Sequence, residues 1–118
     1  MIKIEELTNE DCIYAMETGE FSDKILASAS RVIIILTQSW CPDWWVQKRV
    51  FRDTEDTANL KVYYLEYDKK DFKSEFTGFK ETVFQNGLIP YLRYYKEGTL
   101  DSESNYSGRR QIRKWLKS

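Results

Sequence analysis

Residues that could carry out thiol chemistry lie directly after a strongly apolar run. Val32 to Leu36 is aliphatic throughout, which is typical of a strand buried on both faces of a sheet. The segment Trp40-Cys41-Pro42-Asp43 follows shortly after it. Proline is favoured at the first position of a helix, because its missing N–H would be unpaired there anyway. The pattern therefore predicts Cys41 at the start of a helix, followed by Pro42 and Asp43.

The start of a helix is a favourable position for a nucleophilic sulfur. The free N–H groups and the positive end of the helix dipole stabilise the thiolate, which is the reactive form of cysteine. Asp43 acts in the opposite direction, because a nearby carboxylate disfavours a second negative charge. We therefore expect Cys41 to be a moderately activated nucleophile. The alternative is that Cys41 is an inert, buried apolar residue.

Trp44 stands three residues after Cys41, where a second cysteine would complete a Cys-x-x-Cys pair. Without that cysteine, a thiolate can still attack a disulfide and form a mixed disulfide. Release then needs an outside thiol, such as glutathione, or Cys12. Because Cys12 lies near Ile13 and Met16 on an amphipathic pattern, we predict that it packs in the core instead.

Helical and strand patterns alternate along the chain. Together they predict an α/β domain over residues 1–118, with three layers and a mixed central sheet flanked by helices. The expected helices cover residues 9–18, 24–30, 42 to about 58 and 72–84, with a last helix after a Ser107 cap. The expected strands cover residues 32–37, 62–67, 91–95 and 99–106, with a further short strand at 2–4.

Composition removes several classes of function. The 118 residues include two cysteines and no histidine, so we expect no metal site, no disulfide framework and no histidine-based catalysis. The formal net charge is -1, which gives no reason to expect nucleic acid or a membrane as a partner. The first residues have no apolar segment typical of a secretory signal. We therefore expect a cytoplasmic protein, and the sequence does not indicate its oligomeric state.

Charge is uneven along the chain. Acidic residues dominate positions 1–23, whereas Arg109, Arg110, Arg113, Lys114 and Lys117 follow one another near the end without an acid between them. We interpret this asymmetry as the usual preference of helix N-terminal turns for acids and of C-terminal turns for bases. A basic docking patch is the alternative.

The residues and the order of elements together resemble the thioredoxin-like superfamily over about residues 2–118. Val32–Thr37 with the segment Ser39 to Asp43 is similar to the strand and W-C-x-x-C turn of that family, in particular to the branch with the motif W-C-P-D-C. Ile89-Pro90 is similar to the family's cis-proline step, and Tyr94 to Gly98 is similar to its β-hairpin turn. The resemblance implies a thioredoxin-like fold.

The resemblance also implies a reaction and a site. The family's reaction is dithiol–disulfide exchange, but Trp44 replaces the resolving cysteine, and Ile35 stands where thioredoxins keep a buried acid. We therefore expect Cys41 to act as a lone nucleophile in thiol–disulfide exchange with protein or small thiol substrates. Beyond glutathione or another thiol as co-reductant, we expect no cofactor. The expected substrate groove is formed by Trp40, Pro42, Asp43, Trp44, Ile89 and Pro90.

A second hypothesis is a thioredoxin fold that binds a protein or peptide without catalysis. Trp40, Trp44 and Trp45 cannot all point inward, so we expect at least one at the surface near Cys41. Exposed aromatic residues are suited to protein recognition. Glutathione binding of the glutaredoxin kind is a third, weaker hypothesis. Arg93 is unusual in an expected central strand, where it would reach the sheet edge or pair with Asp68 or Glu66.

Overall fold

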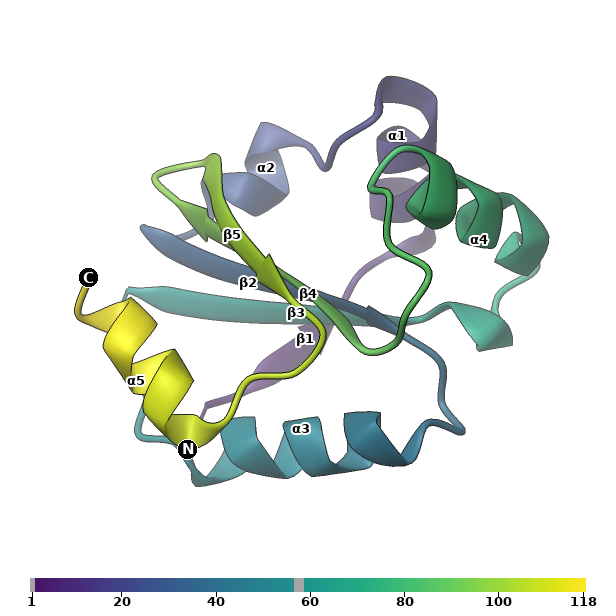
Figure 1. The fold of residues 1–118 in the computed structure, drawn as a ribbon. Helices are drawn as coiled ribbons and strands as arrows, with labels where there is room; N and C mark the ends of the chain where they lie inside the picture. The colour runs from purple at the N-terminus through teal and green to yellow at the C-terminus, as the bar shows by residue number, and fades with distance from the viewer. Residues whose placement is uncertain (1, 57–58) are drawn as a thin grey trace.

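A mixed sheet of five strands organises the residues that the computed structural model describes, which are 2–56 and 59–118 (Figure 1). The strand order is β1-β3-β2-β4-β5, so β1 and β5 are the edges. β1 and β2 pair with β3 in parallel, and β4 runs antiparallel to both β2 and β5. The strands are β1 (Ile4–Glu6), β2 (Arg31–Thr37), β3 (Leu60–Glu66), β4 (Tyr91–Lys96) and β5 (Thr99–Ser104).

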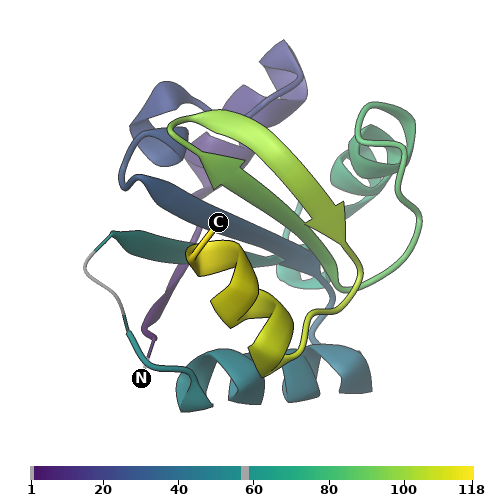
Figure 2. The same ribbon diagram turned by 60° about the vertical axis from the view of Figure 1, so that its left-hand side comes forward.

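Helices cover both faces of the sheet, which gives the three layers expected from the sequence (Figures 1 and 2). α1, α2 and α4 pack on one face, and α3 and α5 pack on the other. The helices are α1 (Asn9–Thr18), α2 (Asp23–Leu26), α3 (Pro42–Asp53), α4 (Lys73–Thr82) and α5 (Arg109–Leu116), and a 3-10 turn covers Tyr67–Lys69. Among the described residues, no helix has the length and apolarity needed to cross a bilayer.

The central strand β2 confirms the predicted buried run. Val32, Ile34 and Leu36 point into the layer of α1, α2 and α4, whereas Ile33 and Ile35 point toward α3 and α5. All five side chains are 0% exposed. Burial of each contributes about 1.5–3 kcal/mol, so β2 anchors both cores and fixes the position of the segment that follows it.

The first helix begins and ends where its sequence predicts. The Thr8 hydroxyl accepts a hydrogen bond from the Asp11 N–H, and the Asp11 carboxylate accepts one from the Thr8 N–H, which forms a capping box. Gly19 ends the helix at φ 92°, a conformation that favours glycine. α1 turns Cys12 inward, where it is 0% exposed. The prediction that Cys12 packs in the core is confirmed.

Several helix ends differ from the expected ones. α3 ends at Asp53, because the Thr54 hydroxyl binds the Val50 carbonyl at 2.5 Å and the backbone of Thr54 is extended. The expected end near Ala58 lies outside the described residues. α2 stops at Leu26 and α4 stops at Thr82, both short of the predicted ends.

Ser107 does not cap α5. Gly108 is the N-cap residue, and the Gln111 side chain accepts a hydrogen bond from its N–H at 2.7 Å. The Ser107 hydroxyl is hydrogen-bonded to the Tyr94 hydroxyl instead. Ser107 therefore joins the last helix to the sheet, which is a contact between distant residues that local capping rules do not reveal.

Arg93 pairs with Glu20 and Glu103 and not with Asp68 or Glu66, and because Glu103 lies 3.8 Å away on the edge strand β5, the expectation that Arg93 reaches the sheet edge is confirmed. β4 lies between β2 and β5, and Arg93 points into the layer of α1 and α4, on the same face as Tyr91 and Tyr95. Its guanidinium pairs with Glu20 at 2.8 Å, just beyond the end of α1. Glu66 faces the opposite layer, where it accepts a hydrogen bond from Trp44 of α3. The buried charge is thus compensated within one layer.

Candidate functional site

The strand register brings Cys41 beside Ile89 and Pro90. Leu36, near the end of β2, pairs with Tyr91, the first residue of antiparallel β4. The chain segments after β2 and before β4 therefore lie at the same edge of the sheet. The Cys41 sulfur lies 3.8 Å from the Ile89 carbonyl oxygen, to which the thiol can donate a hydrogen bond. The Ile89–Pro90 peptide bond is cis.

Cys41 is the N-cap residue of α3, as its sequence predicts. Its backbone is extended (φ -76°, ψ 117°), and Pro42 follows as the first helical residue. The Cys41 carbonyl accepts hydrogen bonds from the N–H groups of Trp44 at 3.1 Å and Trp45 at 3.3 Å. The residue is only 5% exposed. Little of the residue is therefore accessible to solvent.

Asp68 holds the connection between β2 and α3, and the sequence analysis did not assign it to the site. Its carboxylate accepts hydrogen bonds from the Ser39 backbone N–H at 2.8 Å and from the Ser39 hydroxyl at 2.5 Å. Burial alone would raise the pKa of Asp68, but these hydrogen bonds hold that pKa below its ordinary value. The sequence could have indicated this contact, because the residues that follow two neighbouring parallel strands, here β2 and β3, lie at the same edge of the sheet.

Trp44 does not line a substrate groove, which corrects the expectation for this residue. Its side chain is 0% exposed and lies beneath α3. The indole N–H donates to the Glu66 carboxylate at 2.8 Å, and the ring packs against Tyr64 with centroids 5.8 Å apart. The helix places position 44 on its sheet-facing side, one turn after Cys41. The site that a second cysteine would occupy is thus filled by a core side chain.

Trp40 and Trp45 are at the surface, as expected for at least one of the three tryptophans near Cys41. Trp40 is 59% exposed and Trp45 is 49% exposed. Each keeps a hydrogen bond, because the Trp40 indole N–H donates to the Gln38 side chain at 2.7 Å and that of Trp45 donates to the Ser39 carbonyl at 2.8 Å. These bonds hold two large, exposed apolar side chains within four residues of Cys41 in the sequence.

Lys80 fixes the segment that leads to Ile89. Its side chain is 1% exposed, and its ammonium donates to the carbonyls of Asn86 at 2.8 Å and Leu88 at 2.7 Å. Burial lowers the pKa of Lys80 to about 8. The sequence shows Lys80 on the same helical pattern as Phe76 and Phe79, so its inward orientation could be predicted. The carbonyls to which it donates could not.

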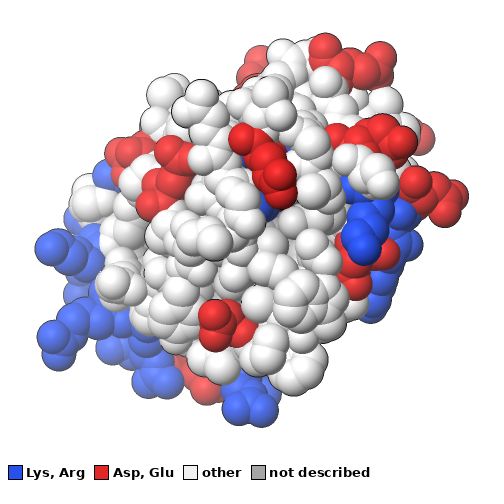
Figure 3. All heavy atoms as spheres, turned by 45° about the vertical axis from the view of Figure 1, so that its right-hand side comes forward, with Lys and Arg blue, Asp and Glu red and all other residues white. Residues whose placement is uncertain are grey.

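The other residues expected to form the substrate groove differ in exposure. Pro42 and Asp43 are exposed, Ile89 is half-buried and Pro90 is buried. Leu88, which precedes Ile89, is 64% exposed. The face that carries the start of α3 and the segment between α4 and β4 shows few charged atoms (Figure 3). This face offers mainly apolar and neutral contacts around the thiol.

Neither cysteine is bonded to another, and Cys12 and Cys41 are both free thiols. Burial, with a contribution from Asp11, raises the pKa of the Cys12 thiol to about 12. Among the described residues, no three or more histidine, cysteine, aspartate or glutamate side chains are placed to hold a metal ion. Cys41 is the free thiol that lies beside Ile89 at the start of α3.

Comparison with known proteins reveals similarity at the level of structure. No protein-family model matches the chain, and no curated protein matches its sequence. Similar solved structures include thioredoxin O1 from Arabidopsis thaliana in its oxidised state, with 14% identity, a TM-score of 0.64, and coverage of 97% of this chain and 95% of that one.

Two further structures are similar over nearly the whole chain. A mutant thioredoxin from Halobacterium salinarum has 11% identity and a TM-score of 0.67, covering 98% of this chain and 88% of that one. The protein Trxlp from Edwardsiella tarda has 17% identity and a TM-score of 0.61, covering 97% and 98%. At these identities the likeness establishes the fold. The chain has a thioredoxin fold, as its sequence predicts.

Proposed function

We propose that this protein carries out thiol–disulfide exchange through Cys41 as a lone nucleophile. The observation that carries the proposal is the position of the thiol: it caps the start of α3 beside Ile89, while Trp44 fills the place of a resolving cysteine. A helix N-terminus stabilises a thiolate. A buried tryptophan in place of the second thiol limits the site to one covalent step per encounter.

The proposed reaction has two balanced steps. In the first, the Cys41 thiolate attacks one sulfur of a substrate disulfide; a bond to Cys41 forms, the substrate S–S bond breaks, and the other substrate sulfur leaves as a thiolate that takes up a proton. In the second, a free thiolate such as that of glutathione attacks the substrate sulfur of the mixed disulfide. This forms a new disulfide between substrate and glutathione and releases the Cys41 thiolate.

The cycle needs a supply of free thiol, and we place the protein in the cytoplasm for this reason. Two free cysteines in the same chain are consistent with a reducing compartment. The substrate would be a protein or small-molecule disulfide. Backbone groups at Ile89 and the apolar surfaces of Trp40 and Trp45 would contact it around the sulfur.

Mass spectrometry of the adduct tests this proposal. Incubation with glutathione disulfide is expected to add one glutathione to Cys41, and reduced glutathione is expected to remove it. Cys12→Ser should keep the adduct, and Cys41→Ser should lose it. No adduct, or an adduct on Cys12 alone, would contradict the proposal. Repeated turnover of insulin with thioredoxin reductase in the absence of glutathione would contradict the lone-cysteine mechanism.

A second candidate function is binding of an extended protein segment without catalysis. The supporting observation is that Trp40 and Trp45 are about half exposed or more, whereas Cys41 between them is 5% exposed. On this hypothesis, Cys41→Ser binds each partner as well as the wild type does, whereas Trp40→Ala weakens binding. Binding measurements on Cys41→Ser and Trp40→Ala therefore separate this function from thiol–disulfide exchange, which requires Cys41.

A further inference from the structure

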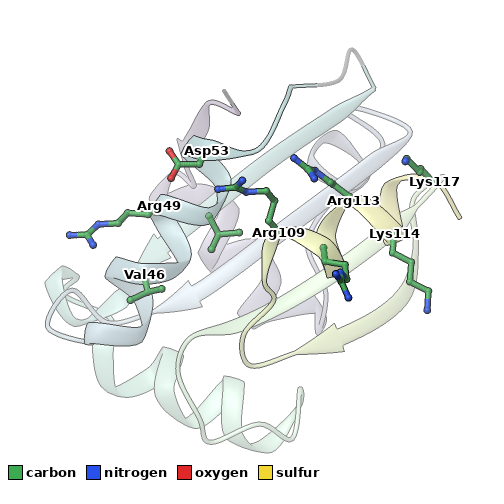
Figure 4. Close-up of a pocket in the computed structure, with 9 residues that line it drawn as sticks. Val46, Arg49, Asp53, Arg109, Arg113, Lys114 and Lys117 are labelled. Carbon is green, nitrogen blue, oxygen red and sulfur yellow. The ribbon is translucent and has the colours of Figure 1, made fainter.

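A groove between α3 and α5 gathers basic side chains well away from Cys41, toward the opposite end of α3. It has a volume of about 700 Å³. Figure 4 shows Arg49 and Asp53 on α3, Arg109, Arg113 and Lys114 on α5, and Lys117 directly after α5, with Arg109 reaching toward α3. The basic lining residues are Arg49, Arg109, Arg110, Arg113, Lys114 and Lys117.

Acidic side chains offset only part of the positive charge in this groove: Asp53 lines it, and Glu55 and Asp56 line an adjoining hollow that Arg113 and Lys117 share. Within residues 2–56 and 59–118, none of the six basic residues forms an ion pair. Among the described residues that line the groove, Asp53 is the acidic one, and it pairs with Arg52 at 3.2 Å. Arg52 is not among the lining residues. The groove therefore presents several free guanidinium and ammonium groups to solvent.

Helix electrostatics account for only part of this charge, so our interpretation of the sequence holds for the last turn of α5 and not for the first. A negative helix end favours Arg113 and Lys114 in the last turn, but Arg109 and Arg110 occupy the first turn, where no acid is present. Positive charge at that end opposes the helix dipole. Arg109 with Arg113, and Arg110 with Lys114, are also like-charge pairs four residues apart, which destabilise a helix.

The groove is held in shape by contacts beneath it. The Gln47 side chain of α3 donates to the Ser107 carbonyl and accepts from the Ser107 N–H, both at 2.8 Å. Phe51 of α3 and Ile112 of α5 are 0% exposed in the shared core. The two helices are thus fixed relative to each other before any ligand arrives, which lowers the entropic cost of binding.

We propose that this groove binds an acidic amphipathic segment of a partner protein. Val46 is 45% exposed and Val50 is half-buried, so the α3 side offers an apolar surface. An amphipathic helix can place its apolar side chains there while its carboxylates meet Arg109 and Arg113, which bind carboxylates in a two-pronged geometry. No aromatic residue is present among the described lining residues, and single-stranded nucleic acid usually needs aromatic stacking.

Fluorescence anisotropy with a synthetic peptide tests the proposal. The probe is a fluorescein-labelled peptide of about four helical turns with leucine on one face and glutamate elsewhere. Arg109→Glu/Arg113→Glu is expected to weaken its binding by about tenfold or more, and added salt should weaken binding to the wild type. Lys24→Glu/Lys73→Glu, which changes the net charge equally on α2 and α4, should leave affinity within about twofold.

Further variants and probes keep the test decisive. Arg109→Gln/Arg113→Gln, with circular dichroism to verify folding, should give an intermediate loss and covers the case in which the glutamate variant does not fold. Equal binding of a peptide with glutamine in place of glutamate would overturn the proposal. So would an affinity that none of the groove variants changes. Two other results would also overturn it. Binding of oligothymidine but not of the peptide would assign the groove to single-stranded nucleic acid. A dimer of this protein that the groove variants dissociate would assign it to a second copy of the chain.

Discussion

The indole N–H of Trp44 donates a hydrogen bond of 2.8 Å to the carboxylate of Glu66, which joins the helix after Cys41 to the end of β3. Lys69 pairs with the same carboxylate at 3.1 Å. The Lys48 ammonium lies 5.2 Å from the centroid of the Trp44 ring. The residue that stands in place of a resolving cysteine therefore contacts Glu66 at the end of β3 and Lys48 on its own helix, and Lys69 holds Glu66 in turn.

Replacement of Trp44 by phenylalanine should lower stability. The variant keeps an aromatic ring against Tyr64 but removes the hydrogen bond to Glu66 and leaves space in the core. We expect the free energy of unfolding to fall by about 1–3 kcal/mol, as measured by urea denaturation. Trp45→Phe is the matched control, because Trp45 is 49% exposed, and it should change stability by less than about 0.5 kcal/mol. Equal effects of the two variants would contradict the role of Trp44.

The two thiols should differ strongly in reactivity. The pKa of Cys12 is raised to about 12 by burial and by Asp11, so the native protein at neutral pH should hold almost no Cys12 thiolate. Iodoacetamide should therefore modify Cys41 in the native state, and Cys12 only after denaturation. Peptide mapping by mass spectrometry measures both. Modification of native Cys12 at a rate similar to that of Cys41 would show that α1 does not protect it.

Lys80→Met should destabilise the segment before Ile89, because the carbonyls of Asn86 and Leu88 lose their donor. We expect a loss of about 1–3 kcal/mol in the free energy of unfolding. Methionine fits the buried space without a charge. Exchange of backbone amides in residues 86–90 should become faster, whereas exchange within β2 should not.

The same variant should change the dependence of stability on pH. Burial lowers the pKa of Lys80 from 10.5 to about 8 in the folded protein, so between these values the unfolded chain binds more protons at this group. Lys80 therefore makes the free energy of unfolding rise with pH across that window. Urea denaturation at both ends of the window should show a smaller rise for Lys80→Met. Parallel curves for the two proteins would contradict this prediction.

Asp68→Ala should release the segment before Cys41. Ser39 would lose the acceptor of its backbone N–H and of its hydroxyl. Amide hydrogen exchange at Ser39 should accelerate about tenfold or more, and Asp68→Asn should be intermediate because it keeps one acceptor. The pKa of Asp68 is lowered in the folded state, so its stabilising contribution is present above the ordinary pKa of aspartate and is lost as the pH falls. Unchanged exchange at Ser39 would contradict this role.

Much of the fold could be predicted because its signals are local. The aliphatic run of β2, the Cys41-Pro42 step and the caps of α1 each depend on a few neighbouring residues. The orientation of Trp44 could not be predicted in this way, since its partner Glu66 is distant in sequence and belongs to another strand. Local rules allow a tryptophan at the start of a helix to point toward the sheet or toward solvent.

The site was predicted in part for the same reason. Cys41, Ile89 and Pro90 belong to motifs that the sequence displays, and the structure brings them together. The role of Asp68 depends on the pairing of β2 with β3, and that of Lys80 depends on how the chain folds back after α4, and neither is visible in a local pattern. The basic patch near the end of the chain was only the alternative interpretation of the sequence, because the part that α3 contributes to the groove cannot be seen from the last helix alone.

The edges of the sheet have a consequence for colloidal behaviour. β1 is only three residues long and carries Glu5 and Glu6, and β5 carries Asp101 and Glu103 on an exposed strand. Strand edges with unpaired backbone groups can recruit other chains and start aggregation. These carboxylates pair with Lys61, Lys70, Lys96 and Arg93 respectively, so each edge carries charged, hydrated side chains that a second chain would have to desolvate in order to pair there. Charged edges of this kind disfavour extension of the sheet by another chain, and they lie on both sides of the apolar central strand β2.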